Sequence, residues 1–492
     1  MRTSLTHPLQ IAAIFAGPGM GRVGLTFCPG KRQPDAATGA WARDLDIDLD
    51  AVAAWGAAAV VTLIEPAEIK RLGVAPLGDK VAARHMAWHH LPIRDVSTPS
   101  AAFEARWQEV GEDLRARLRA RFDVLLHCKG GLGRAGTMAA RLLAELGWEP
   151  AQAIAAVRAA RPGAIETAAQ ARDVMAVRPR AEAVSDTSLD AMRRRAQGAF
   201  LGLAVGDAIG TTLEFSARDT LPRLTGMIGK GPFRLEPGQW TDDTAMALAL
   251  GASLETCGGL DEADLMRRFV KWQEDGDYSC TGTCFDIGVT TGRALNRWKR
   301  TGDPITGSTD PRTAGNGSLM RLAPVVVRSF RDRDAMRDMA ARQSRTTHAA
   351  PEAVDACVAF AEVLADAING CPRGEVLRPR DWPAYTGRIA PIMTGSWRGK
   401  QRAEIRSSGY VAHSLEAALW CVGRTGSFAE AVLLAANLGD DADTTAAITG
   451  QLAGALYGIE GIPSAWREQV ALGNRIEAMA GRLFAAGLGL EE

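Results

Sequence analysis

The sequence predicts a multidomain protein, in which an N-terminal α/β domain with a parallel sheet precedes an all-α domain. Up to about residue 180, short apolar runs alternate with helical stretches, which is typical of parallel sheets. Beyond residue 192 strand signals nearly vanish, and Ala/Leu-rich windows dominate. The polar, aperiodic stretch AEAVSDTSLD between them indicates a linker. We expect an α/β domain at 1–180, a linker at 181–191 and an all-α domain at 192–492.

Each expected element of the first domain follows from its residues. The run LQIAAIFAGPGMG begins a first buried strand, and AAAVVTLI (57–64) and FDVLLHC (122–128) are further buried strands. Segments 101–120 and 136–147 place apolar residues three and four apart, as amphipathic helices do. In the second domain, TAMALALGASLE, SLEAALWCV and FAEAVLLAANL are expected helices broken by Gly-rich loops.

Length and charge exclude several classes of protein. A chain of 492 residues is too long for one ordinary core. With 57 basic and 57 acidic residues, it has no general attraction for nucleic acid or anionic membrane, although a local patch stays open. No run of about eighteen apolar residues predicts a membrane span. Eight scattered cysteines, including the lone pair Cys280 and Cys284, suit neither a disulfide framework nor a zinc site, so we expect a cytoplasmic protein.

The first constellation is VLLHCKGGLGRAGT (124–137), a strand, a Gly-rich loop and a helix start. Its GLGRAG also matches a dinucleotide-binding fingerprint, but several elements precede it and a helix follows, which disfavours that reading. A loop entering a helix points backbone N–H groups inward and cradles an anion. The positive electrostatic field of these N–H groups lowers the pKa of Cys128 and so favours its thiolate. Arg134 can bind two phosphate oxygens at once.

This arrangement predicts hydrolysis of a phosphomonoester through a cysteine nucleophile. Cys128 attacks phosphorus to give a phosphocysteine, which water then hydrolyses, and Asp95 in LPIRDVSTP lies on a loop that can supply the leaving group's proton. The expected phosphate-binding residues of the loop are Lys129, Gly130, Gly131 and Gly133.

Residues 8 to 180 resemble the dual-specificity branch of protein tyrosine phosphatases, particularly the cyclin-dependent-kinase-inhibitor-3 type, through LTFCPGKR, HLPIRDVSTP, HCKGGLGRAGT and ARPGAIET. The resemblance implies Cys128 as nucleophile, Arg134 as phosphate clamp and Asp95 as general acid. Many such phosphatases carry Ser or Thr after the arginine to help release the phosphocysteine. Here that position is Ala135, and only the more distant Thr137 offers a hydroxyl. A phosphate-binding module without turnover is therefore an alternative.

The second constellation consists of two acidic clusters, each just ahead of a small apolar helix. GDDADTT holds Asp440, Asp441 and Asp443, and QWTDDT holds Asp242 and Asp243. One anion at a helix start is ordinary capping, but several raise one another's pKa unless a cation is bound. With Thr241 and Thr444, the clusters supply oxygen ligands that suit Mg²⁺, Mn²⁺ or Ca²⁺, in numbers sufficient for two ions.

These clusters, with GAFLGLAVGDAIGTTLEF, GNGSLMRLAPV and TTHAAPEA, resemble the ADP-ribosylglycohydrolase family, whose best-known bacterial member is the dinitrogen-reductase-activating glycohydrolase. The resemblance covers residues 192 to 486 and implies an all-α fold with two Mg²⁺ (or Mn²⁺) ions. It assigns one ion to Thr241, Asp242 and Asp243 and the other to Asp441 and Thr444, with Asp443 bridging. Asp440 stands where the family often has Gly.

The same resemblance implies a substrate that carries an ADP-ribosyl group, either a modified protein or a small molecule. Glu214 matches a glutamate that closes over the site and can act as base. The other implied substrate-binding residues are Gly315, Asn316, Gly317 and Ser318 of a diphosphate-binding loop, together with His348, Asp286 and Tyr410. The acceptor stays open among arginine, serine, a nucleic-acid end and a metabolite.

The sequence thus predicts a bifunctional hydrolase that removes ADP-ribose in its C-terminal domain and hydrolyses a phosphomonoester in its N-terminal domain. One alternative keeps the ADP-ribosyl hydrolase active and makes the phosphatase-like domain a phosphate-binding recruitment module. The other is a non-enzymatic adaptor that binds ADP-ribose and phosphate; the complete carboxylate set disfavours it.

Overall fold

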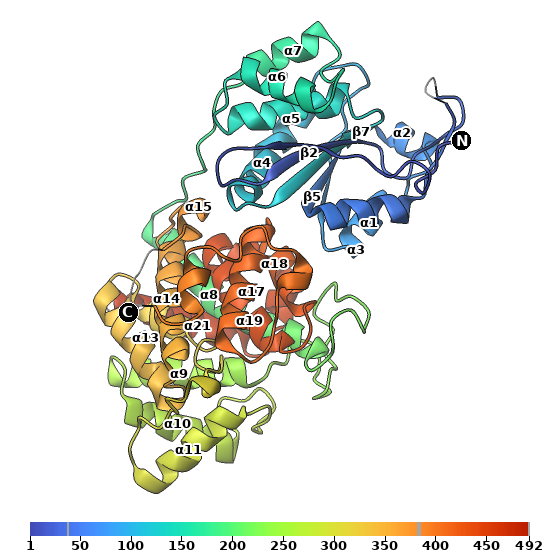
Figure 1. Cartoon of the computed structure of the whole chain (residues 1–492). Coiled ribbons are helices and arrows are strands. Elements are labelled where there is room, and N and C mark those ends of the chain that lie inside the picture. The colour runs from blue at the N-terminus through green and yellow to red at the C-terminus, as the bar shows by residue number, and fades with distance from the viewer. Residues whose placement is uncertain (37–38, 381–384, 491–492) are drawn as a thin grey trace. The chain divides into compact units, whose positions relative to one another are not determined.

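The computed structural model describes residues 1–36, 39–380 and 385–490. Within them the chain divides into two compact units, Met1–Ala183 with Gly423–Thr425, and Val184–Val422 with Gly426–Glu492 (Figure 1). None of the described helices is both long and apolar enough to cross a bilayer.

The first unit is built on a five-stranded, mostly parallel sheet. Its strand order is β1-β2-β7-β5-β6, and only the β1–β2 pair is antiparallel. The strands are β1 Ala12–Phe15, β2 Arg22–Phe27, β5 Ala57–Thr62, β6 Ala87–His90 and β7 Asp123–Cys128, and a small second sheet pairs β3 Arg32–Gln33 with β4 Trp41–Ala42. Because β7 lies at the centre, its last residue, Cys128, emerges in the middle of the sheet's carboxyl edge.

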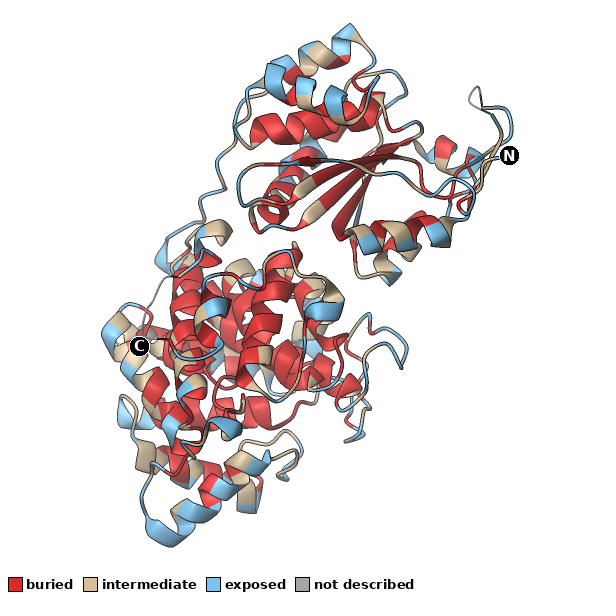
Figure 2. Cartoon of the chain, in the orientation of Figure 1, coloured by how far each residue is buried: buried red, intermediate tan, exposed pale blue. Residues whose placement is uncertain are grey.

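Helices cover both faces of this sheet. They are α1 Leu45–Trp55, α2 Pro66–Arg71, α3 Leu77–Ala83, α4 Ala101–Arg119, α5 Gly133–Glu145, α6 Pro150–Ala160 and α7 Ala168–Met175. Helices α4 to α7 lie on one face and α1 and α3 on the other, as right-handed crossovers require (Figure 1). Figure 2 shows the sheet and α5 as the buried centre of the unit. The α/β fold predicted for this part of the chain is present.

The second unit is helical, and its described part contains isolated bridges but no strand. Its helices are α8 Leu189–Gly210, α9 Asp242–Cys257, α10 Glu262–Asp275, α11 Val289–Thr301, α12 Ala323–Ser329, α13 Arg333–Thr347, α14 Pro351–Ile368, α15 Arg373–Val376, α16 Ile389–Met393, α17 Val411–Arg424, α18 Phe428–Ala436, α19 Ala442–Tyr457, α20 Ser464–Gln469 and α21 Gly473–Gly487. The predicted all-α fold is present, with α8 and α19 buried at its centre (Figure 2).

A glycine seam joins α8 to α19, consisting of Gly198, Gly202, Gly206 and Gly210 on α8 against Ala442, Ala446, Gly450 and Gly454 on α19. A β-carbon at Gly202 would overlap the carbonyl oxygen of Gly450, and one at Gly210 would lie 2.5 Å from the Cα of Asp443. The two helices are therefore in backbone contact. This contact brings Asp207 of α8 beside the start of α19, where Asp443 lies.

Replacing Gly202 with valine is expected to weaken the seam by about 3 kcal/mol, because the added atoms must separate two touching backbones. Hydrogen-exchange mass spectrometry should show lost amide protection in peptides from α8 and α19. Gly259→Ala is the matched control, because a β-carbon there meets no atom within 4 Å. Unchanged protection in Gly202→Val would show that the helices can separate at little cost.

Candidate functional sites

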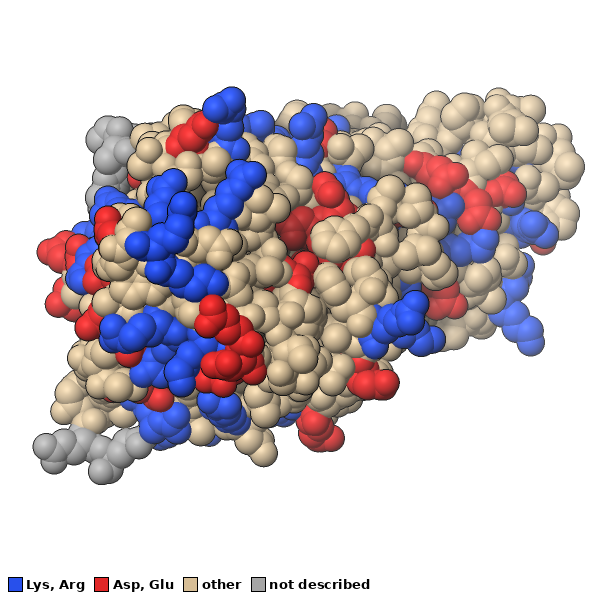
Figure 3. All heavy atoms as spheres, turned by 90° about the horizontal axis from the view of Figure 1, so that it is seen from below, with Lys and Arg blue, Asp and Glu red and all other residues tan. Residues whose placement is uncertain are grey.

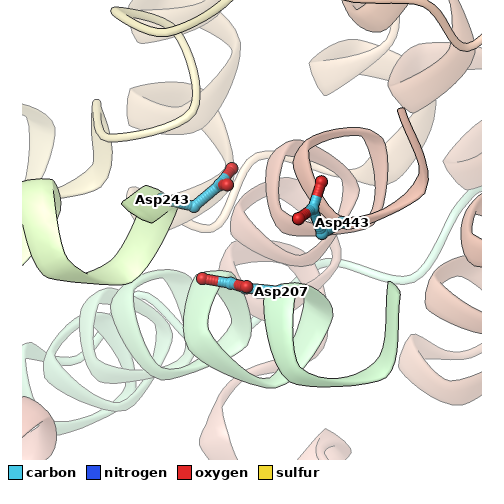
Figure 4. A group of neighbouring side chains, drawn as sticks. All are labelled: Asp207, Asp243 and Asp443. Atoms are coloured by element: carbon cyan, nitrogen blue, oxygen red, sulfur yellow. The ribbon is translucent and has the colours of Figure 1, made fainter. Parts of the chain in front are cut away.

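Acidic side chains from three helices converge inside the second unit. Carboxylate oxygens of Asp207 (α8), Asp243 (α9) and Asp443 (α19) all lie within 4.8 Å of one another (Figure 4). A second group meeting the same criterion contains Glu214, Asp441 and again Asp443. The fold therefore brings the two predicted acidic clusters together around Asp443.

Asp207 is an addition that the sequence reasoning missed. Its Oδ1 accepts hydrogen bonds from the backbone N–H and the hydroxyl of Thr241, each at 2.9 Å. Its Oδ2 accepts the corresponding pair from Thr244, at 3.1 and 2.6 Å. With both oxygens engaged in this way, Asp207 positions the start of α9. The motif GAFLGLAVGDAIG contains Asp207, but its partners Thr241 and Thr244 are more than thirty residues away in sequence and become apparent only in the fold.

The crowding of buried carboxyl groups in this cluster favours a bound cation. Burial, and then the neighbouring carboxylates, raise the pKa of Asp242 and Asp243 well above the usual range and that of Asp441 to about 7. Oδ1 of Asp243 is buried without a hydrogen-bond partner in the described structure. An unpartnered buried oxygen among crowded carboxylates is costly unless a positive charge lies beside it. Oxygen-only donors fit Mg²⁺ or Mn²⁺.

Asp242, Asp441 and Asp443 of the acidic clusters line a cavity of about 340 Å³. The predicted residues that line it are Glu214, Asp242, Asp286, Gly315, Asn316, Gly317, His348, Asp441, Asp443 and Thr444. Burial, and then Asp443, raise the pKa of Asp286 to about 10. Figure 3 shows acidic side chains gathered in a hollow among uncharged residues. The cavity is therefore acidic where the metal ligands are expected.

Other predicted residues of this site lie differently. Thr241 and Asp243 are buried and do not line the cavity. The Ser318 hydroxyl is fully buried and lies 2.8 Å from the Ser344 hydroxyl, so it does not face a ligand. The Tyr410 hydroxyl donates to Glu352 at 2.6 Å, away from the cavity lining. Ser318 and Tyr410 thus support the loop around the cavity.

Glu214 is tied to the start of α19. Its Oε2 accepts hydrogen bonds from the backbone N–H groups of Ala442 at 2.7 Å and Asp443 at 3.1 Å. The next residue, Phe215, donates its N–H to the carbonyl of Asp440 at 2.8 Å, and both residues have φ near +60°. Strained backbone of this kind clusters at functional sites. Glu214 is therefore held beside Asp443 and does not lie on a free loop.

The first unit places Cys128 in a tight loop between β7 and α5. The backbone N–H of Gly131 donates to the Cys128 sulfur at 3.2 Å. Gly131 has φ +71°, and a β-carbon there would lie 2.5 Å from the carbonyl of Thr26, so only glycine fits. Arg161 donates to the carbonyls of Gly130 and Gly131, each at 3.1 Å, which turns these oxygens outward.

Arg134 lies beside Cys128 between two acids. It forms a two-point ion pair with buried Glu68, at 2.6 and 3.0 Å, and its Nη2 lies 2.9 Å from Asp95. Burial opposes ionisation of Glu68, but the hydrogen bonds from Arg134 prevail and lower the pKa of that carboxyl. Asp95 remains half-exposed at the mouth of the site. The sequence reasoning placed Asp95 here and missed Glu68.

These residues surround a second cavity, of about 260 Å³. Cys128, Arg134, Asp95, Lys129 and Gly130 line it, whereas Gly131 and Gly133 shape the loop behind it. Lys31 and Glu166 also line it and were not predicted. Burial lowers the pKa of Lys31 to about 8, and its ammonium lies 4.3 Å from the centre of the Trp41 ring. Lys31 belongs to the motif LTFCPGKR and Glu166 to the motif ARPGAIET.

The expected hydroxyl of Thr137 is not available to this cavity. It is buried and donates to the carbonyl of Gly133 at 2.8 Å, inside α5. None of the described residues that line the cavity carries a hydroxyl. Release of a phosphocysteine would therefore proceed without the help that a Ser or Thr at position 135 gives.

Comparison with known families separates the chain in the same way. Residues 188–490 match the family model described as ADP-ribosylglycohydrolase. Residues 42–174 match the model described as the Swiss Army Knife protein, DSP-PTPase phosphatase domain.

Individual relatives match the second unit. The chain is 47% identical over 297 residues to ADP-ribosylarginine hydrolase Tri1 of Serratia proteamaculans, covering 59% of this chain and 79% of that protein. It is 34% identical to ADP-ribosyl-[dinitrogen reductase] glycohydrolase of Rhodospirillum rubrum, covering 55% of this chain and 88% of that protein. A solved structure, an ADP-ribosylglycohydrolase-related protein complex, aligns with a TM-score of 0.54 at 39% identity, over 61% of this chain and 99% of the other.

Proposed function

Because this chain belongs to the ADP-ribosylglycohydrolase family, we propose that its helical part cleaves the N-glycosidic bond between ADP-ribose and an arginine side chain. Two relatives named ADP-ribosylarginine hydrolases, at 47% and 48% identity, favour arginine over serine, a nucleic-acid end or a metabolite as the acceptor. The observation that carries the proposal is the buried, unpartnered Oδ1 of Asp243, which belongs to one acidic group with Asp443, a residue that lines the cavity.

We assign this activity to residues 192–492, with two Mg²⁺ (or Mn²⁺) ions as its cofactors. Thr241, Asp242 and Asp243 would hold one ion, Asp441 and Thr444 the other, and Asp443 would bridge them. When bound, the ions polarise ribose hydroxyls and make water a better nucleophile. Asn316 donates to Asp441 at 2.6 Å and so connects the predicted diphosphate-binding loop to a predicted metal ligand.

The remaining chemistry falls to the chain's own residues. The bond that breaks joins the anomeric carbon to the guanidine nitrogen, which keeps the electron pair, leaves as a neutral guanidine and takes up a proton from solvent. The new bond joins that carbon to a water oxygen. Carboxylates around the cavity stabilise the positive charge that develops on the sugar. Glu214 is fixed at the cavity by its backbone hydrogen bonds, which supports its carboxyl group as the base that accepts the water's proton.

A direct assay tests this function. The intact protein with Mg²⁺ should release ADP-ribose from an ADP-ribosylarginine peptide, as measured by chromatography, and chelation with EDTA should stop the release. Parallel assays use an ADP-ribosylserine peptide and an oligonucleotide with an ADP-ribosylated end. Faster release from either of these would overturn arginine as the acceptor, and release that persists in EDTA would overturn the metal requirement.

We assign phosphomonoester hydrolysis through Cys128 to residues 1–180, joined to the helical part by residues 181–191. The Gly131 N–H, which donates to the Cys128 sulfur, supports Cys128 as the nucleophile. Arg134 would bind the phosphate, and the position of Asp95 beside Arg134 supports Asp95 as the acid that protonates the leaving group. A phosphate-binding recruitment module is the second candidate, because Ala135 and the engaged hydroxyl of Thr137 leave the release step without help. All eight cysteines are free, as in a reducing cytoplasm.

A further inference from the structure

The ring of His348 lies against the glycines of the GNGS loop. A β-carbon at Gly317 would lie 2.7 Å from Cε1 of His348, and one at Gly315 would lie 3.2 Å from Nε2. His348 lines the same cavity as these glycines. The ring can therefore approach the loop only because both positions lack side chains, and Nε2 is the nitrogen nearest to both glycines.

The other ring nitrogen belongs to a chain of hydrogen bonds whose direction is determined. Nη2 of Arg321 lies 2.8 Å from the Thr347 hydroxyl oxygen, which in turn lies 2.8 Å from Nδ1 of His348. A guanidinium only donates, so the Thr347 oxygen must accept from Arg321. Nδ1 is the one remaining partner that the described residues offer to the hydroxyl hydrogen of Thr347, so that hydrogen is donated to Nδ1. A neutral ring in this position carries its hydrogen on Nε2.

The start of this chain is fixed in place. Arg321 is fully buried, its Nε donates to the side chain of Gln343 at 3.0 Å, and its guanidinium stacks 4.6 Å from the Phe269 ring centre. Burial lowers the pKa of Arg321 to about 9, which leaves it charged at neutral pH. Burial, and then the charge of Arg321, lower the pKa of His348 to about 3, so the ring is neutral.

We propose that Arg321, acting through Thr347, is a positioning residue that holds His348 as the Nε2–H tautomer, so that the ring donates a hydrogen bond to an anionic oxygen of the bound ADP-ribosyl diphosphate. The opposite tautomer would present a lone pair to that anion. The ligand in this inference rests on the proposed function, whereas the tautomer rests only on the hydrogen-bond directions. Arg321 is fully buried and does not line the cavity, so it acts on a ligand only through His348.

The tautomer is tested first in the unmodified protein. Nitrogen-15 NMR of the His348 ring should show a hydrogen on Nε2 and a bare, hydrogen-bonded Nδ1. Thr347→Val removes the hydroxyl while keeping the shape, and should give a mixture of tautomers. Thr347→Ser restores the hydroxyl and should restore the wild-type spectrum. Thr449→Val is the matched control, because the Thr449 hydroxyl is buried as well but donates to the Thr445 carbonyl, and among the described residues it forms no hydrogen bond with Arg321, Thr347 or His348.

Binding of ADP-ribose in the presence of Mg²⁺ is tested next, by calorimetry. Thr347→Val should weaken it about 2- to 5-fold, because only the fraction of rings that still carries the hydrogen on Nε2 can donate to the diphosphate. KM for the ADP-ribosylated peptide should rise by a similar factor and kcat should change less. Thr347→Ser should recover most of the affinity, and Thr449→Val should bind as the wild type does.

The two levels of the inference fail in different ways. A hydrogen on Nδ1 in the wild type, or an unchanged spectrum in Thr347→Val, would overturn the relay, whatever the protein hydrolyses. An Nε2–H ring in a protein that binds no ADP-ribose would leave the relay standing and overturn the proposed function. Wild-type affinity in Thr347→Val with altered tautomers would show that His348 does not donate to the diphosphate.

Discussion

Replacing Asp443 with alanine is expected to reduce ADP-ribosyl hydrolysis by about 10³-fold or more, which is roughly 4 kcal/mol of lost transition-state stabilisation. Asp443 belongs to both acidic groups and lines the cavity. Its Oδ1 also accepts the N–H of Thr444 at 2.7 Å, and its Oδ2 lies 3.3 Å from the Thr241 hydroxyl. Its loss should therefore disturb both predicted ion positions while leaving phosphomonoester hydrolysis intact.

The measurement is the rate of ADP-ribose release, with Mn²⁺ binding followed by calorimetry in the same preparation. Asp443→Asn keeps the shape of the side chain and separates loss of charge from loss of packing. Asp332→Ala is the matched control, because Asp332 caps α13 by accepting the N–H of Ala335 at 3.0 Å, far along the chain from the clusters. A wild-type rate in Asp443→Ala would end the two-metal mechanism.

Replacing Cys128 with serine should reduce phosphomonoester hydrolysis by about 10³-fold or more, because a serine hydroxyl at neutral pH is a far weaker nucleophile than a thiolate. Asp95→Asn should slow alkyl phosphates more than nitrophenyl phosphate, because only poor leaving groups need the proton. Both variants are assayed by phosphate release. Cys257→Ser, at an exposed position outside the first unit, is the control.

The same variant separates the two candidate roles of this domain. If the wild type releases no phosphate from any tested phosphopeptide, and Cys128→Ser binds the phosphopeptide as tightly as the wild type, the recruitment module is favoured. If release from the wild type shows a rapid burst followed by slow turnover, the phosphocysteine is accumulating. Such a burst is the result expected from Ala135 and from the hydroxyl of Thr137, which is engaged within α5.

Local sequence predicted those parts of the sites that a few consecutive residues build. Cys128 and Arg134 are brought together by one strand, one loop and the first turn of α5, so their spacing was sufficient. Lys31 lines the same cavity and Glu68 pairs with Arg134, and both come from other parts of the fold, across contacts that no local pattern records.

The acidic site shows the same limit. Asp242, Asp243, Asp441 and Asp443 could be predicted because each cluster precedes a small apolar helix. Asp207 lies in the last turn of the long helix α8. Its role depends on the tertiary contact of α8 with Thr241 and Thr244 at the start of α9. Ser318 was predicted from its place in the GNGS run, but its hydroxyl lies against Ser344 because the loop turns that side chain inward.

Because of the glycine seam between α8 and α19, side-chain atoms added far from the acidic cavity can change the position of the carboxylates that line it. A helix is stiff over its length, and Gly454 lies roughly 16 Å along α19 from Asp443 at 1.5 Å per residue. A rigid tilt of α19 by about 5° about Gly454 would therefore move the Asp443 carboxylate by more than about 1 Å. Misplacement by about 1 Å can cost roughly 10²-fold in rate. The glycines thus set how accurately the Asp443 carboxylate is positioned. Substitutions along the seam should therefore lower the rate of hydrolysis before they unfold the protein.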